Sequence, residues 1–149
     1  MTASETWRAT RQRYYRVFAR AHNALLLRTR GRPERLGWRM RCLVLETTGR
    51  RSGQARRVVL LYMPDGDGCV VIASNFGNER PPAWWVNLQS SPEAWVERRG
   101  RRARVRAREL HGDERMATLA RAMAYNKQWR GYASTVQRPL PIVRLEARP

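Results

Sequence analysis

Hydrophobic residues recur with two different periods along this chain of 149 residues. Between residues 5 and 29 they return every three, four or seven positions. The apolar positions are Trp7, Tyr14, Phe18, Ala21 and Leu25. This period is typical of an amphipathic helix, and Ser4 is a suitable N-cap residue. Glycines and a proline between residues 31 and 37 end the pattern and predict a connection.

Beyond residue 41 the period changes to two, which predicts strands. The expected strands are 42–48, 56–63, 69–74, 93–97, 101–110 and 141–146. Glycine-rich turns at 49–54 and 65–68 join the first three as hairpins. Short helices are expected at 83–89, opened by two prolines, and at 114–125, capped by Asp113. Residues 126–132 are expected to form an aromatic loop.

Neighbouring strands joined by tight turns favour an antiparallel sheet, since parallel strands need long crossover connections. We therefore expect a mainly antiparallel α+β fold, built as a barrel. The length suits a single domain over 1–149, with an N-terminal helix and connection at 1–37 and the barrel at 38–149. Two short helices complete this arrangement.

The charge of the chain is its most unusual bulk property. Lys and Arg number 30 against 12 Asp and Glu, a net charge of +18, and Lys127 is the one lysine. Such an excess attracts acidic partners, which include nucleic acid, anionic lipid and polyanionic small molecules. No apolar run reaches the length of a membrane span, and no signal peptide is expected. Cys42 and Cys69 lack metal-ligand spacing, which favours free thiols in the cytoplasm and excludes a zinc site.

The arginines divide into groups by position. Four alternate along one predicted strand, at Arg102, Arg104, Arg106 and Arg108, and are expected to form a solvated outer face. The hairpin at 47–57 differs, because it combines four arginines with hydroxyls and two glycines. Glycines let backbone N–H groups converge, and hydroxyls and guanidinium groups add donors. This hairpin suits a phosphate or several carboxylates, although an ordinary basic hairpin has the same composition.

Two further segments favour a flat, phosphorylated ligand. The sequence IASNFGN at 72–78 leaves a strand through small residues, where a ligand can approach the backbone. The sequence PAWWVN at 82–87 then places two tryptophans at a helix start. An anion site, a small-residue strand end and an aromatic helix start are together what a planar, phosphorylated cofactor requires.

The segments TTGRRSGQAR, VIASNFGN, PAWWVNLQSSP and RPLPIVRLE resemble the deazaflavin-dependent nitroreductase family of actinobacteria. The resemblance covers residues 38 to 147. It implies a split β-barrel related to FMN-binding oxidases. It also implies binding of reduced coenzyme F-420, a deazaflavin with a phosphate and an acidic poly-γ-glutamate tail. Hydride would pass from its C5 atom to an electron-poor, hydrophobic enone, quinone or nitro compound.

The resemblance also assigns expected site residues. The phosphate and tail would lie on Arg50, Arg51, Ser52, Arg56 and Arg57. The rest of the coenzyme would lie on Val58, Val59, Leu60, Leu61, Ile72, Ala73, Ser74, Asn75, Ala83, Trp84, Trp85, Val86, Asn87 and Trp129. The substrate pocket would be formed by Phe18, Asn126, Trp129 and Tyr132, with Tyr132 and Ser74 as candidate catalytic hydroxyls.

The sequence departs from the family pattern at several positions. One phenol, Tyr132, stands where nitro-reducing members carry several tyrosines, and Trp85 replaces the usual tyrosine of the short helix. These changes predict a bulkier and more apolar pocket, while the basic hairpin is intact. Each tryptophan has a second interpretation as a core residue, because adjacent helix residues point in different directions.

Two alternatives use the same residues differently. The first keeps the fold and the reductase chemistry but binds FMN. The second is a non-enzymatic protein that binds nucleic acid or an anionic membrane, as the charge alone would suggest. We expect no specific nucleic-acid binding, peripheral membrane contact through the N-terminal helix as an accessory feature, and either a monomer or a dimer.

Overall fold

The computed structural model describes Ala24, Leu27, Arg28 and residues 41–149. Most of the predicted N-terminal helix, its expected membrane contact and Phe18 therefore lie outside the described residues. Ala24, Leu27 and Arg28 are helical, as predicted. None of the helices among the described residues is long and apolar enough to cross a membrane.

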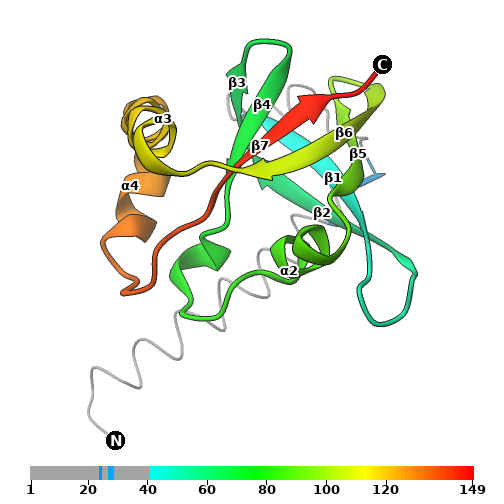
Figure 1. Cartoon of the computed structure of the whole chain (residues 1–149), viewed down its shortest axis with the longest axis horizontal. Coiled ribbons are helices and arrows are strands. Elements are labelled where there is room, and N and C mark those ends of the chain that lie inside the picture. The colour runs from blue at the N-terminus through cyan, green and yellow to red at the C-terminus, as the bar shows by residue number, and fades with distance from the viewer. Residues whose placement is uncertain (1–23, 25–26, 29–40) are drawn as a thin grey trace, which may run out of the picture.

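One curled antiparallel sheet organises the described chain (Figure 1). Its strands are β1 (Cys42–Thr48), β2 (Ala55–Leu61), β3 (Met63–Asp65), β4 (Gly68–Ile72), β5 (Glu93–Arg98), β6 (Arg101–Glu109) and β7 (Ile142–Ala147). They follow the order β2-β1-β5-β6-β7-β4-β3. The antiparallel α+β class predicted from the sequence is confirmed.

The connection between β2 and β3 forces the sheet to curl. These strands occupy opposite edges of the sheet, yet Tyr62 alone separates them in the chain. The two edges must therefore meet at Tyr62, whose N–H donates to the Arg41 carbonyl at 3.2 Å. The sequence predicts a single strand here. Because the chain changes edge at Tyr62, it forms two strands instead, and the described sheet has seven strands where five or six are expected.

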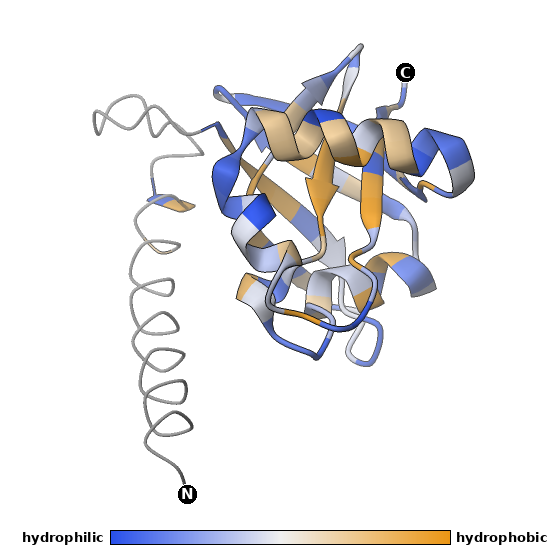
Figure 2. Cartoon of the chain, turned by 90° about the vertical axis from the view of Figure 1, so that its left-hand side faces the viewer, coloured by the Kyte–Doolittle hydropathy of each residue, from blue (hydrophilic) through white to orange (hydrophobic). Residues whose placement is uncertain are grey.

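Two apolar clusters stabilise the two faces of the sheet. The first fills the barrel interior, with Leu43, Leu45, Val71 and Leu145 fully buried, and it includes Trp84 and Trp85 from α2 (Ala83–Ser90). The second lies under α3 (Gly112–Tyr125) and α4 (Lys127–Ala133) and contains Val70, Ile72, Trp129 and Ile142. In Figure 2 the central strands carry the apolar colour, while several hairpin ends are hydrophilic. Alternation along β4 and β7 supplies both clusters from the same strands.

Helix α4 differs from the prediction, because residues 127–133 are helical rather than an aromatic loop. Asn126 explains the helix start, since its side chain accepts a hydrogen bond from the Gln128 N–H at 2.9 Å. Asp113 is not the cap of α3. The helix begins at Gly112, two residues before the predicted start, and Asp113 lies in its first turn, where a carboxylate interacts favourably with the helix dipole. The described residues thus carry three α-helices after the N-terminal segment.

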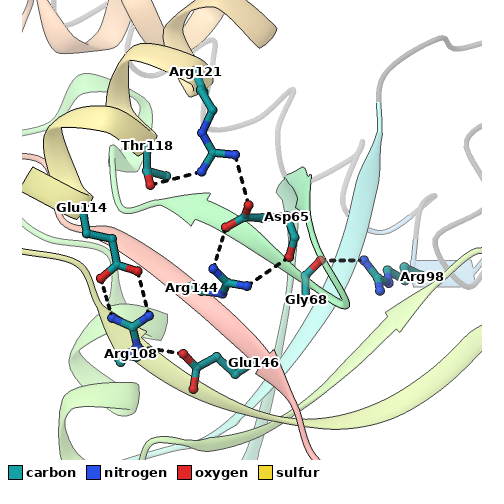
Figure 3. Close-up of polar contacts among 9 residues, drawn as sticks. All are labelled: Asp65, Gly68, Arg98, Arg108, Glu114, Thr118, Arg121, Arg144 and Glu146. Carbon is teal, nitrogen blue, oxygen red and sulfur yellow. Dashed lines mark hydrogen bonds and ion pairs between the residues drawn. The ribbon is translucent and has the colours of Figure 1, made fainter.

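A cluster of ion pairs fixes α3 to the sheet (Figure 3). Asp65, at the end of β3, pairs with Arg121 of α3 at 3.1 Å and with Arg144 of β7 at 3.0 Å. Its side chain is only 12% exposed. One carboxylate therefore ties together a hairpin, a helix and a strand.

We expect Asp65→Ala to lower the free energy of unfolding by about 2 to 3 kcal/mol, because it leaves two guanidinium groups without their shared carboxylate. The matched control is Glu93→Ala, which removes a 39% exposed carboxylate that pairs with Arg106. This control should cost less than about 1 kcal/mol. Urea unfolding followed by far-UV circular dichroism measures both. Equal losses in the two variants would contradict the role of Asp65.

Candidate functional site

A cavity of about 680 Å³ lies beside β2, which is an edge strand of the described sheet. Its walls come from β2, the β1–β2 turn, the segment after β4, the start of α2 and one face of α4. In Figure 1 the β1–β2 turn and α4 lie on opposite sides of α2, so the cavity connects distant parts of the chain. This size is typical of a small-molecule or cofactor site.

Most of the predicted site residues meet at this cavity. They are Arg50, Arg51, Ser52, Arg56, Arg57, Val58, Val59, Leu60, Leu61, Ile72, Ser74, Asn75, Ala83, Trp84, Asn87, Trp129 and Tyr132. Four predicted residues lie elsewhere: Ala73 and Trp85 are buried in the barrel core, Val86 does not line the cavity, and Asn126 caps α4. Trp84 lines the cavity and also packs in the barrel core, whereas Trp85 packs in the core and does not line the cavity.

The sequence interpretation missed six lining residues: Cys42, Thr47, Gly49, Phe76, Pro82 and Gln128. Thr47 and Gly49 belong to the basic hairpin and are close to the predicted set. Gln128 could not be placed, because the helix that presents it was expected to be a loop. Phe76 gave no periodic signal, since it lies in an irregular turn.

Residues 49–54 connect β1 to β2 and form what we call the basic turn. Hydrogen bonds between uncharged groups hold it in shape. Gly49 N–H donates to the Gln54 carbonyl, and Gly53 N–H donates to the Gly49 carbonyl, both at 2.8 Å. A Cβ atom on Gly49 would lie 2.8 Å from the Ser52 Oγ, which explains the need for glycine. Ser52 Oγ in turn accepts from the Gln54 N–H at 3.2 Å and from Arg56 at 3.4 Å. The turn is therefore ordered without an acidic residue.

Asn87 connects this turn to helix α2. Its Oδ1 accepts from the Arg50 N–H at 3.1 Å, and its Nδ2 donates to the Thr47 Oγ1 at 3.0 Å. Asn87 and Thr47 are both buried, so the bond between them is protected from water. Asn87 thus fixes the basic turn against the helix start that carries Trp84.

The arginines of the turn differ from the others in their partners. Within the described residues, Arg50, Arg51 and Arg56 form no ion pair, and no acidic residue lines the cavity. Arg57 contributes to the lining as well, but its guanidinium pairs with Glu97 at 3.0 Å and with Glu46 at 3.6 Å. Adjacent strand residues point to opposite faces, which explains the difference between Arg56 and Arg57. One end of the cavity therefore carries positive charge that the described residues do not neutralise.

The predicted outer arginine face is confirmed, and its charge is largely paired. Arg102 contacts Glu46 at 2.8 Å, and Arg106 contacts Glu93 at 2.7 Å. Arg108 bonds Glu114 and Glu146, which raises the pKa of its guanidinium and lowers the pKa of the Glu114 carboxyl. Three of its four arginines are therefore paired with glutamates of the same chain.

The middle and far end of the cavity are apolar and aromatic. Strand β2 supplies Val58 to Leu61, and Trp129 of α4 is buried against the second apolar cluster. Tyr132 lies half-buried, with its ring edge-to-face against Phe76 at a centroid distance of 6.3 Å. Ser74 is 8% exposed and lines the same end. The cavity is thus cationic at one end and suited to a flat apolar group at the other.

Cys42 and Cys69 are free and buried, as expected. Burial raises the pKa of each thiol to about 11. No group of three or more His, Cys, Asp or Glu residues in the described part of the chain could hold a metal ion.

Comparison with protein families agrees with this geometry. The family model described as F420H(2)-dependent quinone reductase matches residues 5–147. An F420H(2)-dependent quinone reductase of Mycobacterium tuberculosis is 32% identical over 133 residues, which cover 87% of this chain and 89% of that protein.

Solved structures show the same fold. An F420-H2 dependent reductase, FDR-A, superposes with a TM-score of 0.65 at 26% identity, over 70% of this chain and 93% of its own. A protein described as a domain-swapped dimer has a TM-score of 0.67 at 23% identity, over 97% of this chain and 100% of its own. These similarities confirm the predicted split β-barrel.

Replacing Asn87 tests the connection between α2 and the basic turn. Asn87→Ala should lower the free energy of unfolding by about 1 to 3 kcal/mol, because the Arg50 N–H and the Thr47 hydroxyl lose their buried partner. Hydrogen exchange should accelerate at residues 49–54 more than in the β5–β6 hairpin. Uniform acceleration across the protein would contradict a local role for Asn87.

Both thiols should be unreactive in the folded protein. At a pH near 8, a thiol of pKa 11 is about one part in a thousand thiolate, which is the reactive form. An aromatic disulfide reagent monitored by absorbance should therefore release no more than a trace of signal until the protein is unfolded in urea. Rapid reaction of either thiol before unfolding would contradict the burial of Cys42 and Cys69.

Proposed function

Since the chain belongs to the F420H(2)-dependent quinone reductase family, we propose that it transfers a hydride from reduced coenzyme F-420 to a quinone held in the cavity. The protein is a deazaflavin-dependent reductase, and coenzyme F-420 is its cofactor. The acceptor and the residue roles below belong to the proposal. Enone and nitro compounds are the other acceptors that we propose, because they share the electron-poor, flat character of a quinone.

The residues of the cavity fit the coenzyme at both ends. The observation that carries the proposal is the division of the cavity into a cationic turn and an apolar channel. Arg50, Arg51 and Arg56 would hold the phosphate and the acidic tail, since guanidinium groups match carboxylates and phosphates and no described carboxylate competes for them. A focused positive field at this end also attracts the polyanion from solution.

The flat ring system would lie along β2. Strand β2 is an edge strand of the described sheet, so its outer backbone groups have no strand neighbour among the described residues. They are available to a ligand with polar ring edges, while Val58 and Leu60 provide apolar contact. Trp84 closes this part of the cavity from the start of α2.

When bound, the reduced deazaflavin supplies a hydride from its C5 atom. A quinone that gains this hydride and one proton becomes a hydroquinone, and the coenzyme is oxidised. The protein must hold the acceptor carbon about 3 to 3.5 Å from the donor atom and exclude water from the channel. We assign Tyr132 and Ser74 to the acceptor end, where either hydroxyl can orient the acceptor oxygen or deliver a proton.

A reductase that uses coenzyme F-420 accounts for the observations better than an FMN-binding enzyme or a nucleic-acid-binding protein. The family depends on F420H(2), which favours the deazaflavin over FMN. The nucleic-acid hypothesis depends on the exposed arginine face, but Arg102, Arg106 and Arg108 are occupied by glutamates of the same chain. For the location of the enzyme we propose the cytoplasm, because both cysteines are free thiols.

Paired arginine substitutions test the cofactor site. Arg50→Ala combined with Arg56→Ala should weaken binding of coenzyme F-420 by at least about 100-fold, because two charge-assisted contacts are worth about 1.5 to 3 kcal/mol each. The fluorescence of the deazaflavin, titrated with protein at low salt, gives the dissociation constant. The wild-type affinity should also fall as salt is raised.

The matched control removes the same charge from the outer face. Arg104→Ala combined with Arg106→Ala should change the affinity by less than about 3-fold, because neither side chain lines the cavity and a charge without direct contact acts only through solvent and salt. If both double variants weaken binding equally, the affinity depends on the net charge of the protein and not on these two positions. The assignment of Arg50 and Arg56 to the coenzyme site would then be wrong. Failure of the wild-type protein to bind the coenzyme would overturn the proposed function itself.

A further inference from the structure

Phe76 is an exposed aromatic residue at the acceptor end of the cavity. Its relative exposure is 55%, and it lines the cavity beside Ser74 and Tyr132. Three other large apolar residues of the described chain are exposed, Trp95, Met116 and Tyr125, and none of them lines this cavity. The exposed part of this apolar ring is available for contact with a ligand in the cavity.

The backbone at Phe76 has a conformation that phenylalanine rarely adopts. Its φ is 54° and its ψ is 32°, in the left-handed region, between Asn75 at φ 45° and Gly77 at φ 76°. Asparagine and glycine tolerate this region, but a bulky side chain is disfavoured there, because its Cβ atom comes too close to the following carbonyl oxygen. Folding alone would favour glycine at this position. Strain of this kind persists where the surroundings impose it, and it concentrates at functional sites.

Arg138 supplies the constraint. Its Nη2 donates to the carbonyls of Ala73 and Ser74, at 3.1 and 3.2 Å, and its Nε donates to the carbonyl of Asn78 at 3.1 Å. One guanidinium therefore binds the chain before and after the left-handed turn. This arrangement fixes the direction in which the turn presents Phe76.

The segment after α4 contacts the turn from the other side. A Cβ atom on Gly77 would lie 2.5 Å from the Thr135 Oγ1, and that hydroxyl donates to the Tyr132 carbonyl at 2.9 Å. The edge-to-face contact between the rings of Phe76 and Tyr132 completes this packing. Two aromatic rings from distant parts of the sequence thus form a fixed corner at the end of the cavity opposite the arginines.

We propose that Phe76 is a specificity-determining residue, whose ring stacks on the conjugated ring of the acceptor, and that Arg138 is the positioning residue that aims it. This inference rests on the proposed function, because it places the acceptor and not the coenzyme at this end of the cavity. The stacking gain grows with the size of the acceptor ring system. A fused two-ring quinone should therefore depend on Phe76 more than a one-ring quinone.

Phe76→Leu tests the ring without altering the strain, because leucine is also unfavourable at positive φ. With menadione, a two-ring quinone, the KM of the complete enzyme should rise about 3- to 10-fold, as expected from the loss of one aromatic pair. With duroquinone, a one-ring quinone, the rise should be smaller, and kcat should change little. Phe76→Tyr keeps an aromatic ring and should have the same menadione KM as the wild type. Met116→Ala removes an exposed side chain from α3 and should not change the KM.

Two measurements separate this inference from the proposed function. The first is the dissociation constant of coenzyme F-420, which should be the same in wild type and Phe76→Leu. The second uses the coenzyme-free protein: menadione quenches tryptophan fluorescence, and its dissociation constant should rise in Phe76→Leu by the factor seen in KM. Loss of coenzyme affinity in Phe76→Leu, or unchanged menadione binding, would overturn the role of Phe76. Failure of the wild type to bind coenzyme would count against the proposed function alone.

A third variant distinguishes a functional residue from a structural one. Phe76→Gly should unfold at a higher urea concentration than wild type, because glycine adopts the left-handed conformation without strain. The same variant should weaken menadione binding at least as much as Phe76→Leu. Arg138→Gln should also raise the menadione KM while leaving coenzyme affinity unchanged. A glycine variant that is less stable than wild type would show that Phe76 serves packing, and the inference would fail.

Discussion

The single residue between β2 and β3 is the constraint on which the rest of the structure depends. Because Tyr62 alone joins the two edge strands, the sheet cannot remain open and must curl until its edges meet. Curling creates an interior that the alternating residues of β1, β4 and β7 fill. It also leaves β2 at one edge of the sheet that the described residues form, and β2 lines the cavity. The site is thus a consequence of how the barrel closes.

The sequence pattern was sufficient for most of the fold and for much of the site. Strand β1 was predicted to the residue, because alternation and the turn at Gly49 define both of its ends. The prediction failed where tertiary contacts decide the outcome. Helix α4 forms in a segment with weak periodicity, since Asn126 caps it and Trp129 packs under it. The break at Tyr62 depends on the closure of the whole sheet, which no local window contains.

The missed site residues have the same physical origin. Phe76 could not be identified from spacing, because a left-handed turn has no periodicity and the sequence favours small residues there. Its conformation depends on Arg138, which lies more than sixty positions later in the chain. Likewise Asn87 could be predicted as a ring contact, but its bonds to Thr47 and Arg50 become visible only when α2 packs on the turn. Sequence patterns identify which residue types gather, whereas long-range packing decides what each of them does.

Long-range packing also determines which arginines are paired with carboxylates and which are not. Cross-strand register places Glu46 opposite Arg57 and Glu93 opposite Arg106, so the outer face neutralises much of its own charge. The turn between β1 and β2 contains no carboxylate, and Arg50, Arg51 and the adjacent Arg56 have no ion-pair partner among the described residues. Uncharged partners hold two of them, Asn87 at the Arg50 N–H and Ser52 at the Arg56 guanidinium. An excess of +18 spread evenly would attract any polyanion. Concentrated at one end of an apolar channel, the unpaired part of that excess selects a molecule that is acidic at one end and flat at the other.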